Sequence, residues 1–202
     1  LLPLDHWMQN VFLQGRWTWL IMFGGFIFVS WIAEKWARSD TSIGMQYAGL
    51  FTYVIAQAII LCPLLWIANQ FSMQLSGPGG TQMAVNPITV AAVLTLGIFA
   101  VLTAIVFLTR HDFSYLGPAL GIAGVVGFGL IALSIFGLIN FGILICSAFV
   151  VFACGYILYD TSNILHHYRT DQHVAASLGL FASVALLFWY ILQIVIALSG
   201  RD

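Results

Sequence analysis

The sequence predicts an all-α integral membrane protein, a polytopic helix bundle in which residues 1–202 form a single membrane domain. Two observations favour this class. Hydrophobic residues make up 61% of the chain and charged residues only 6%. The apolar residues also form stretches of about 20, the length at which a helix crosses a bilayer. Because lipid offers backbone amides no hydrogen-bond partner, each stretch is expected to be helical.

Six membrane spans are expected, with short polar connectors between them. Their approximate bounds are 17–33, 45–68, 88–108, 116–136, 138–163 and 174–198. The longest connector, 70–87, has Ser-Gly-Pro-Gly-Gly at its centre and is expected to be a flexible loop. The fourth span is rich in glycine, and the spacing of Gly117 and Gly121 is typical of close helix packing. We therefore expect this span near the centre of the bundle.

The distribution of positive charge predicts the orientation in the membrane. The first, third and fifth connectors carry four cationic residues: Lys35, Arg38, Arg110 and Arg169. On the opposite side, Lys and Arg occur only at the chain ends, as Arg16 and Arg201. The positive-inside rule then places the odd-numbered connectors in the cytoplasm and the C-terminus outside.

Several function classes are disfavoured by composition and motifs. The net charge of −1 and the absence of a basic cluster in the sequence argue against nucleic acid as a partner. The sequence has neither a Gly-x-Ser-x-Gly nor a His-Glu-x-x-His motif, so we expect no enzymatic activity and no cofactor. The three cysteines lie in apolar spans and are expected to be buried thiols rather than a disulfide framework.

Asp160 is the charged residue that falls within a predicted span, toward its cytoplasmic end. An ionisable side chain at that depth is costly, so it is retained for pairing, for handling a proton or ion, or for a structural hydrogen bond. Gln57, in the second span, is a second buried polar candidate. It is expected to hydrogen-bond between helices or to line a polar path, and the first role is favoured.

The residues that follow Asp160 suggest a metal site at first sight, because His166, His167, Asp171 and His173 lie close together in the chain. However, adjacent side chains on a helix point about 100° apart, so His166 and His167 would not chelate one ion without a loop. A cytoplasmic connector with solvated histidines is the favoured interpretation, and no metal is predicted.

Residues 155–162 read Gly-Tyr-Ile-Leu-Tyr-Asp-Thr-Ser and contain Asp160. They resemble the signature helix of the Bax-inhibitor family, the transmembrane Bax-inhibitor-motif proteins. Residues 108–117 resemble its Thr-x-Arg-Asp-Phe-Ser-x-Leu-Gly connector with one residue inserted, and the last span resembles its final helix. The resemblance implies seven spans in the full-length protein, one more than is visible here, with the helix of Asp160 at the centre.

The resemblance also implies a role for Asp160. In many members a second aspartate on the last helix pairs with the signature aspartate, and the pair gates a pH-sensitive calcium leak. The corresponding position here is Ser183, and Gln193 stands where an arginine is common. Counting 1.5 Å per residue places Asp160 and Ser183 at similar depths, so they can be neighbours. A serine adds no charge, which weakens both the proton-sharing pair and a calcium site.

The Tyr-Asp-Thr-Ser form of the motif resembles the bacterial branch that includes the modulator of the FtsH protease. This resemblance implies a protein of the bacterial inner membrane with a regulatory or accessory role in membrane-protein quality control or stress survival. The expected partners are the lipid bilayer and a membrane AAA protease or another membrane complex. The alternative is a pH-sensitive cation leak, for calcium or protons, through Asp160 and Ser183, with Gln57 and Gln193 on its polar path.

Overall fold

The structure is a computed structural model that describes residues 16–38, 42–71, 73–76, 82–139 and 142–200. Within these ranges, six helices are long and apolar enough to cross a membrane. They are α2 (Arg16–Ala37), α3 (Ile43–Ala68), α4 (Pro87–Thr109), α5 (Leu116–Ile135), α6 (Ile143–His166) and α7 (His173–Ser199). A single 3₁₀ turn, η2 (Thr170–Gln172), precedes α7. The predicted class, an all-α polytopic membrane protein, is confirmed.

The longest connector is more ordered than the sequence suggested. Strands β1 (Met73–Ser76) and β2 (Gln82–Val85) form an antiparallel hairpin in which Met73 lies opposite Val85. The segment 77–81 lies outside the described residues. The alternation of apolar and polar residues in 73–76 is the signal of a strand. The expectation of a flexible loop over all of 70–87 was therefore wrong.

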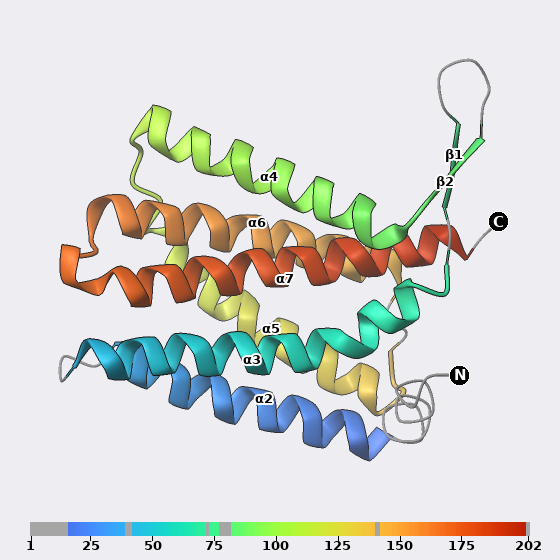
Figure 1. Ribbon diagram of the computed structural model, residues 1–202, viewed down its shortest axis with the longest axis horizontal. Coiled ribbons are helices and arrows are strands. Elements are labelled where there is room, and N and C mark those ends of the chain that lie inside the picture. Colours follow the sequence, from blue (N-terminus) through green and yellow to red (C-terminus); the bar gives the residue numbers. More distant parts are fainter. Residues whose placement is uncertain (1–15, 39–41, 72, 77–81, 140–141, 201–202) are drawn as a thin grey trace.

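Helix α7 has the broadest contacts in the bundle. It packs against α2, α3, α4 and α6, whereas α6 packs mainly against α4, α5 and α7. Figure 1 shows α6 and α7 side by side and antiparallel, with α4 on one side of the pair and α2 and α3 on the other. The centre of the described bundle is thus α7 rather than the helix that carries Asp160.

Helix α5 lies at the periphery, so the expectation that the glycine-rich span is central was wrong. Its close packing is against α6. A Cβ atom added to Gly117 would lie 2.9 Å from the ring of Tyr159, and one added to Gly127 would lie 2.8 Å from the ring of Phe149. By contrast, a Cβ at Gly121 would meet nothing within 4 Å. The glycines therefore admit aromatic side chains of α6 to the surface of α5.

A glycine also ends α5 and delays the start of α6. Gly137 has a φ of 76°, and the next residue, Leu138, donates its backbone N–H to the carbonyl oxygen of Leu133 at 3.0 Å. A left-handed residue followed by a hydrogen bond that reaches back five residues is a common helix C-terminus, the Schellman motif. Consequently α6 begins at Ile143, and not at 138 as the hydrophobic pattern suggested.

Small residues set the separation of α2 and α3. A Cβ on Gly49 of α3 would lie 2.5 Å from the carbonyl oxygen of Ala33 and 2.7 Å from the backbone nitrogen of Ala37. Both alanines are buried. Such close approach of small residues is a common mode of helix association in membranes. It fixes the end of α2, and with it Arg38, beside α3.

Candidate functional site

Asp160 and Ser183 are brought together across the interface of α6 and α7. Asp160 lies six residues before the end of α6, about 9 Å along the helix axis. Ser183 is a buried residue of α7. The hydroxyl group of Ser183 donates a hydrogen bond to Oδ2 of Asp160. The structure thus joins the two residues that the sequence placed at similar depth.

The Ser183 hydroxyl has a second acceptor within reach. Its Oγ lies 3.2 Å from the carbonyl oxygen of Gly179, one turn earlier in α7. A serine has one O–H, so it donates fully to only one acceptor at a time. When Asp160 is ionised, the hydroxyl donates to the carboxylate. When Asp160 is protonated, its own O–H can donate to Ser183, and the serine hydroxyl can turn to Gly179. Both protonation states of Asp160 therefore have a hydrogen-bonded arrangement.

Asp160 also lines a polar cavity of about 1080 Å³. The cavity is bordered by the end of α2, the start of α3, the end of α6 and the connector between α6 and α7. Its charged or titratable lining residues are Arg38, Tyr159, Asp160, His167, Tyr168, Arg169, Asp171 and His173. The end of α2, the start of α3, the end of α6 and the start of α7 lie at the same end of the bundle in Figure 1, and the lining residues of this polar cavity come from these elements and from the connector after α6.

The charges around the mouth of the polar cavity are partly paired with one another. Arg169 lies 3.2 Å from Asp171, and Arg38 lies 4.0 Å from Glu34, with all four side chains more than half exposed. Such exposed pairs contribute little stability. Burial raises the pKa of Tyr168, although the nearby Arg38 opposes that shift, so this phenol stays neutral at physiological pH. In the described part of the chain, the close partner of Asp160 is thus a neutral hydroxyl rather than a cation.

Buried apolar side chains of the core lie close to the Asp160–Ser183 pair along both helices. Ile157 lies three residues before Asp160 on α6, and Leu187 lies four residues after Ser183 on α7; both are fully buried. They belong to the main core cluster, in which α3, α4, α6 and α7 meet. The polar cavity thus reaches Asp160, while buried apolar side chains of the core lie about one turn from the Asp160–Ser183 pair on both helices.

Gln57 and Gln193 do not line the polar cavity. Gln57 is buried and lines a separate, mainly apolar cavity of about 340 Å³ among α2, α3, α5 and α7. Gln193 accepts a hydrogen bond from the thiol of Cys146 at 3.3 Å, near the opposite ends of α6 and α7. A polar path through both glutamines stays a prediction, since the structure places neither of them beside Asp160.

The histidines near Asp160 have separate partners. His166 Nδ1 lies 3.0 Å from the carbonyl oxygen of Ser162, and His167 Nε2 lies 3.8 Å from Oδ2 of Asp112. Among the described residues, no three His, Cys, Asp or Glu side chains gather as metal ligands. Asp171 is paired with Arg169 at the cavity mouth.

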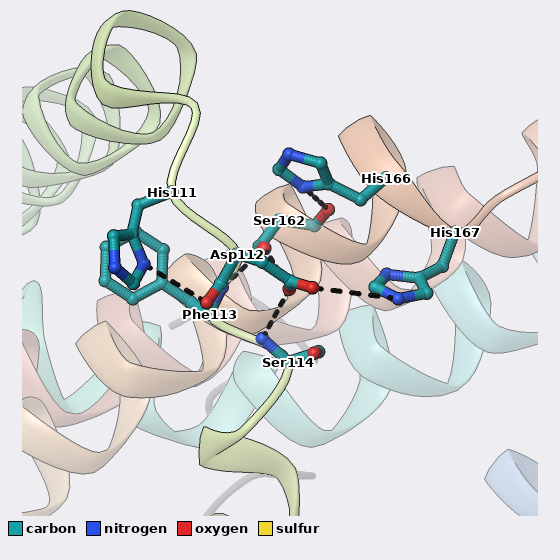
Figure 2. Close-up of polar contacts among 7 residues, drawn as sticks. All are labelled: His111, Asp112, Phe113, Ser114, Ser162, His166 and His167. Atoms are coloured by element: carbon teal, nitrogen blue, oxygen red, sulfur yellow. Dashed lines mark hydrogen bonds and ion pairs between the residues drawn. The ribbon is translucent and has the colours of Figure 1, made fainter.

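A second polar cluster, around Asp112 and Ser162, was not singled out from the sequence. Figure 2 shows the Asp112 carboxylate between Ser114, Ser162 and His167. Asp112 Oδ1 accepts from the backbone N–H of Ser114 at 2.9 Å and from Ser162 Oγ at 3.2 Å. Ser162 in turn accepts from the backbone N–H of Phe113 at 2.8 Å. The Asp-x-Ser sequence of the connector is the signal that could have predicted the first of these bonds.

These contacts lower the pKa of the Asp112 carboxyl group. Hydrogen bonds from Ser114, with smaller contributions from Ser162 and His167, hold the pKa of Asp112 below its ordinary value of 3.8. A lowered pKa means that folding favours the ionised form. The associated stabilisation is therefore present above about pH 4 and is lost as the pH falls through the lowered pKa.

The fold and the site define a class: a polytopic helical membrane protein in which Asp160, hydrogen-bonded between two helices, lines a polar cavity. Comparison with known protein families identifies the family within this class. The model of the family described as "Inhibitor of apoptosis-promoting Bax1" matches residues 6–201. The chain therefore belongs to the Bax-inhibitor family.

Individual relatives come from fungi, plants and viruses. Bax inhibitor 1 of Schizosaccharomyces pombe is 37% identical over 114 residues, which cover 55% of this chain and 43% of the yeast protein. Protein LIFEGUARD 4 of Arabidopsis thaliana is 29% identical over 186 residues, or 83% of this chain and 74% of the plant protein. The Golgi anti-apoptotic protein of vaccinia virus strain Lister is 33% identical over 112 residues, 54% of this chain and 47% of the viral protein. The chain thus spans less than half of the yeast and viral relatives.

Proposed function

We propose that this chain is a non-enzymatic membrane protein that provides a pH-sensitive leak for cations, with Asp160 as the group that takes up the proton or ion. The observation that carries the proposal is the position of the Asp160–Ser183 pair. Asp160 lines a polar cavity of about 1080 Å³ and is hydrogen-bonded to Ser183, and the fully buried Ile157 and Leu187 lie about one turn from the pair. An ionisable residue at such a point is typical of ion and proton pathways.

The chemistry of the pair suggests how the leak responds to pH. A cation that enters the polar cavity meets a carboxylate whose partner is the Ser183 hydroxyl. Protonation of Asp160 removes the charge and allows the hydroxyl to turn to the Gly179 carbonyl. The hydrogen bond that links α6 to α7 thereby changes direction, and this change would alter how the two helices close the path.

The pair also indicates which ion is favoured. Calcium prefers several hard oxygen ligands and usually more than one carboxylate. Asp160 supplies one carboxylate, and its neighbour Ser183 supplies a neutral oxygen. We therefore propose the proton, ahead of calcium, as the ion that this site handles.

Flux measurements in proteoliposomes test the proposal. Because one carboxyl group changes its protonated fraction about tenfold per pH unit beyond its midpoint, proton or calcium flux through the wild type should change about tenfold over the titration range of Asp160. Asp160→Asn keeps the shape of the side chain and should remove this pH dependence. Asp171→Asn, the same change at the exposed mouth of the polar cavity, is the matched control and should retain it. Wild-type flux no greater than that of empty liposomes would refute the leak.

A regulatory or accessory role is the second candidate. Helix α5 is held mainly by α6, and its outer face carries Ile122, Val125 and Val126 more than half exposed. In a membrane this apolar face is available to lipid or to another protein, such as a membrane AAA protease whose activity the chain would regulate. Extraction from native membranes in mild detergent should then retrieve a stoichiometric partner, and purification of the chain alone under those conditions would count against this role.

The proposed location is the bacterial inner membrane, with the odd-numbered connectors in the cytoplasm and the C-terminus outside. Support comes from the Tyr-Asp-Thr-Ser form of the motif and from the positions of Lys35, Arg38, Arg110 and Arg169. Accessibility of single cysteines introduced at Arg110 and at Asn69, on opposite sides in this scheme, to an impermeant thiol reagent would test the orientation.

A further inference from the structure

The connector between α4 and α5 is held in a defined shape beside the end of α6. Arg110 ends α4 in a left-handed conformation, with φ of 50°, and its backbone N–H donates to the carbonyl oxygen of Val106 at 2.8 Å. Two residues later the Asp112 carboxylate accepts from the backbone N–H of Ser114. These local bonds fix the direction of the carboxylate before α5 begins at Leu116.

Ser162 connects this connector to α6. It is fully buried, and its hydroxyl accepts from Phe113 N–H while donating to Asp112 (Figure 2). Ser162 follows Asp160 by two residues, which is about 200° around a helix. Asp160 bonds to Ser183 of α7, whereas Ser162 bonds to the connector on another side of the same turn. Rotation of the end of α6 would therefore disturb both contacts together.

His167 of the α6–α7 connector adds a contact to Asp112. Its Nε2 lies 3.8 Å from Oδ2 of Asp112, with both side chains about half exposed. The ring of His166 is adjacent, with centroids 6.3 Å apart. The charged or titratable groups that share the polar cavity with His167 are Arg38, Tyr159, Asp160, Tyr168, Arg169, Asp171 and His173. At this distance an imidazolium would add a charge attraction to the Asp112 carboxylate that a neutral imidazole does not supply.

We propose that Asp112 is a positioning residue for the Asp160 site: through Ser162 and His167 it holds the end of α6 against the α4–α5 connector, more firmly when His167 is protonated. This inference rests on the proposed function, because its consequence is a change in how Asp160 responds to pH. Asp112 is not itself a lining residue of the polar cavity; it contacts that lining through His167.

Hydrogen exchange of the backbone amides at the end of α6, measured on the full chain in detergent or nanodiscs, tests the contact independently of ion flux. Asp112→Ala removes the carboxylate that accepts from Ser114 and Ser162 and lies beside His167. It should speed exchange over 160–167 about tenfold at both pH 5.5 and pH 8, since hydrogen bonds to charged groups are the stronger ones. Asp112→Asn keeps an acceptor oxygen and should restore most of the protection at pH 8.

The variant His167→Gln isolates the pH-dependent part of the protection against hydrogen exchange. It should match the wild type at pH 8 and lose only the extra protection at pH 5.5, about twofold to threefold, as expected for an exposed ion pair. Asp171→Asn is the matched control, because this carboxylate pairs with Arg169 and not with the cluster. Unchanged exchange in Asp112→Ala would overturn the proposal whatever the flux results.

Ion flux measured as a function of pH then tests whether the contact between Asp112 and the end of α6 affects the Asp160 site. Asp112→Ala should shift the pH of half-maximal flux, and His167→Gln should shift it less. Faster exchange in Asp112→Ala with an unaltered flux profile would overturn the positioning role and leave a purely structural contact. A wild type without flux would instead refute the proposed function, and the exchange data alone would still show whether Asp112 holds α6.

Discussion

Two polar contacts join α6 to α7 near opposite ends of the same helix pair. Ser183 donates to Asp160 at one end, and Cys146 donates to Gln193 at the other. The first contact involves an ionisable group and borders a polar cavity of about 1080 Å³. The second is neutral, and its cysteine lies in a cluster with buried Phe149 and Tyr190. Burial of polar atoms is thus common to both ends, whereas access to a polar cavity distinguishes the Asp160 end.

Helix α5 packs against α6 near both of these contacts, but in different ways. Near Asp160, Gly117 faces the ring of Tyr159, a half-buried residue that borders the polar cavity. Near Cys146, Gly127 faces Phe149, which is buried and stacked on Tyr190 with centroids 4.5 Å apart. The Cys146 end is therefore the better packed, and the Asp160 end has more room to rearrange.

The largest effect is expected from a second carboxylate at the Asp160 end. In Ser183→Asp, two carboxyl groups would meet at hydrogen-bond distance and could not both ionise readily, so one proton would be held to higher pH. The pH of half-maximal flux should rise by about one to three units. The measurement is proton flux in proteoliposomes from pH 5 to 9. An unaltered profile would mean that Asp160 does not set the pH response.

A smaller effect is expected from crowding the well-packed end. Gly127→Ala places a methyl group against the Phe149 ring, which Tyr190 prevents from moving freely, so overpacking should lower stability by about 1–3 kcal/mol. Gly117→Ala should cost less, because Tyr159 has room to turn. Thermal unfolding in detergent measures both, with Gly121→Ala as the control that meets no neighbour. Equal losses at Gly117 and Gly127 would show that the two ends are packed alike.

The smallest effect is expected from the neutral contact. Gln193→Met keeps the length of the side chain but removes the acceptor of the Cys146 thiol. Interhelical hydrogen bonds in membranes contribute about 0.6 kcal/mol on average, so stability should fall by about that amount while the pH profile of flux stays unchanged. A flux profile altered by this variant would remove the functional distinction between the two ends.

Much of the Asp160 site follows from counting residues along two helices joined by a short connector. The distances of Asp160 and Ser183 from that connector are similar, so their contact could be predicted. The Asp112–Ser162 contact joins residues 50 positions apart and depends on the path of another connector, which periodicity does not report. The place of α5 was misjudged because glycine content indicates close packing but not which partner packs there.

The sequence by itself determined that this protein is a bundle of apolar helices with Asp160 held inside a span, since the bilayer dictates both the length of a helix and the rarity of charge within it. Only the tertiary structure decided what surrounds that acid. It set α7 at the centre, joined Asp160 to the polar cavity and tied Ser162 to Asp112. These features arise from how helices rotate and pack against one another. In a chain that is apolar on nearly every helix face, the hydrophobic pattern does not specify that rotation.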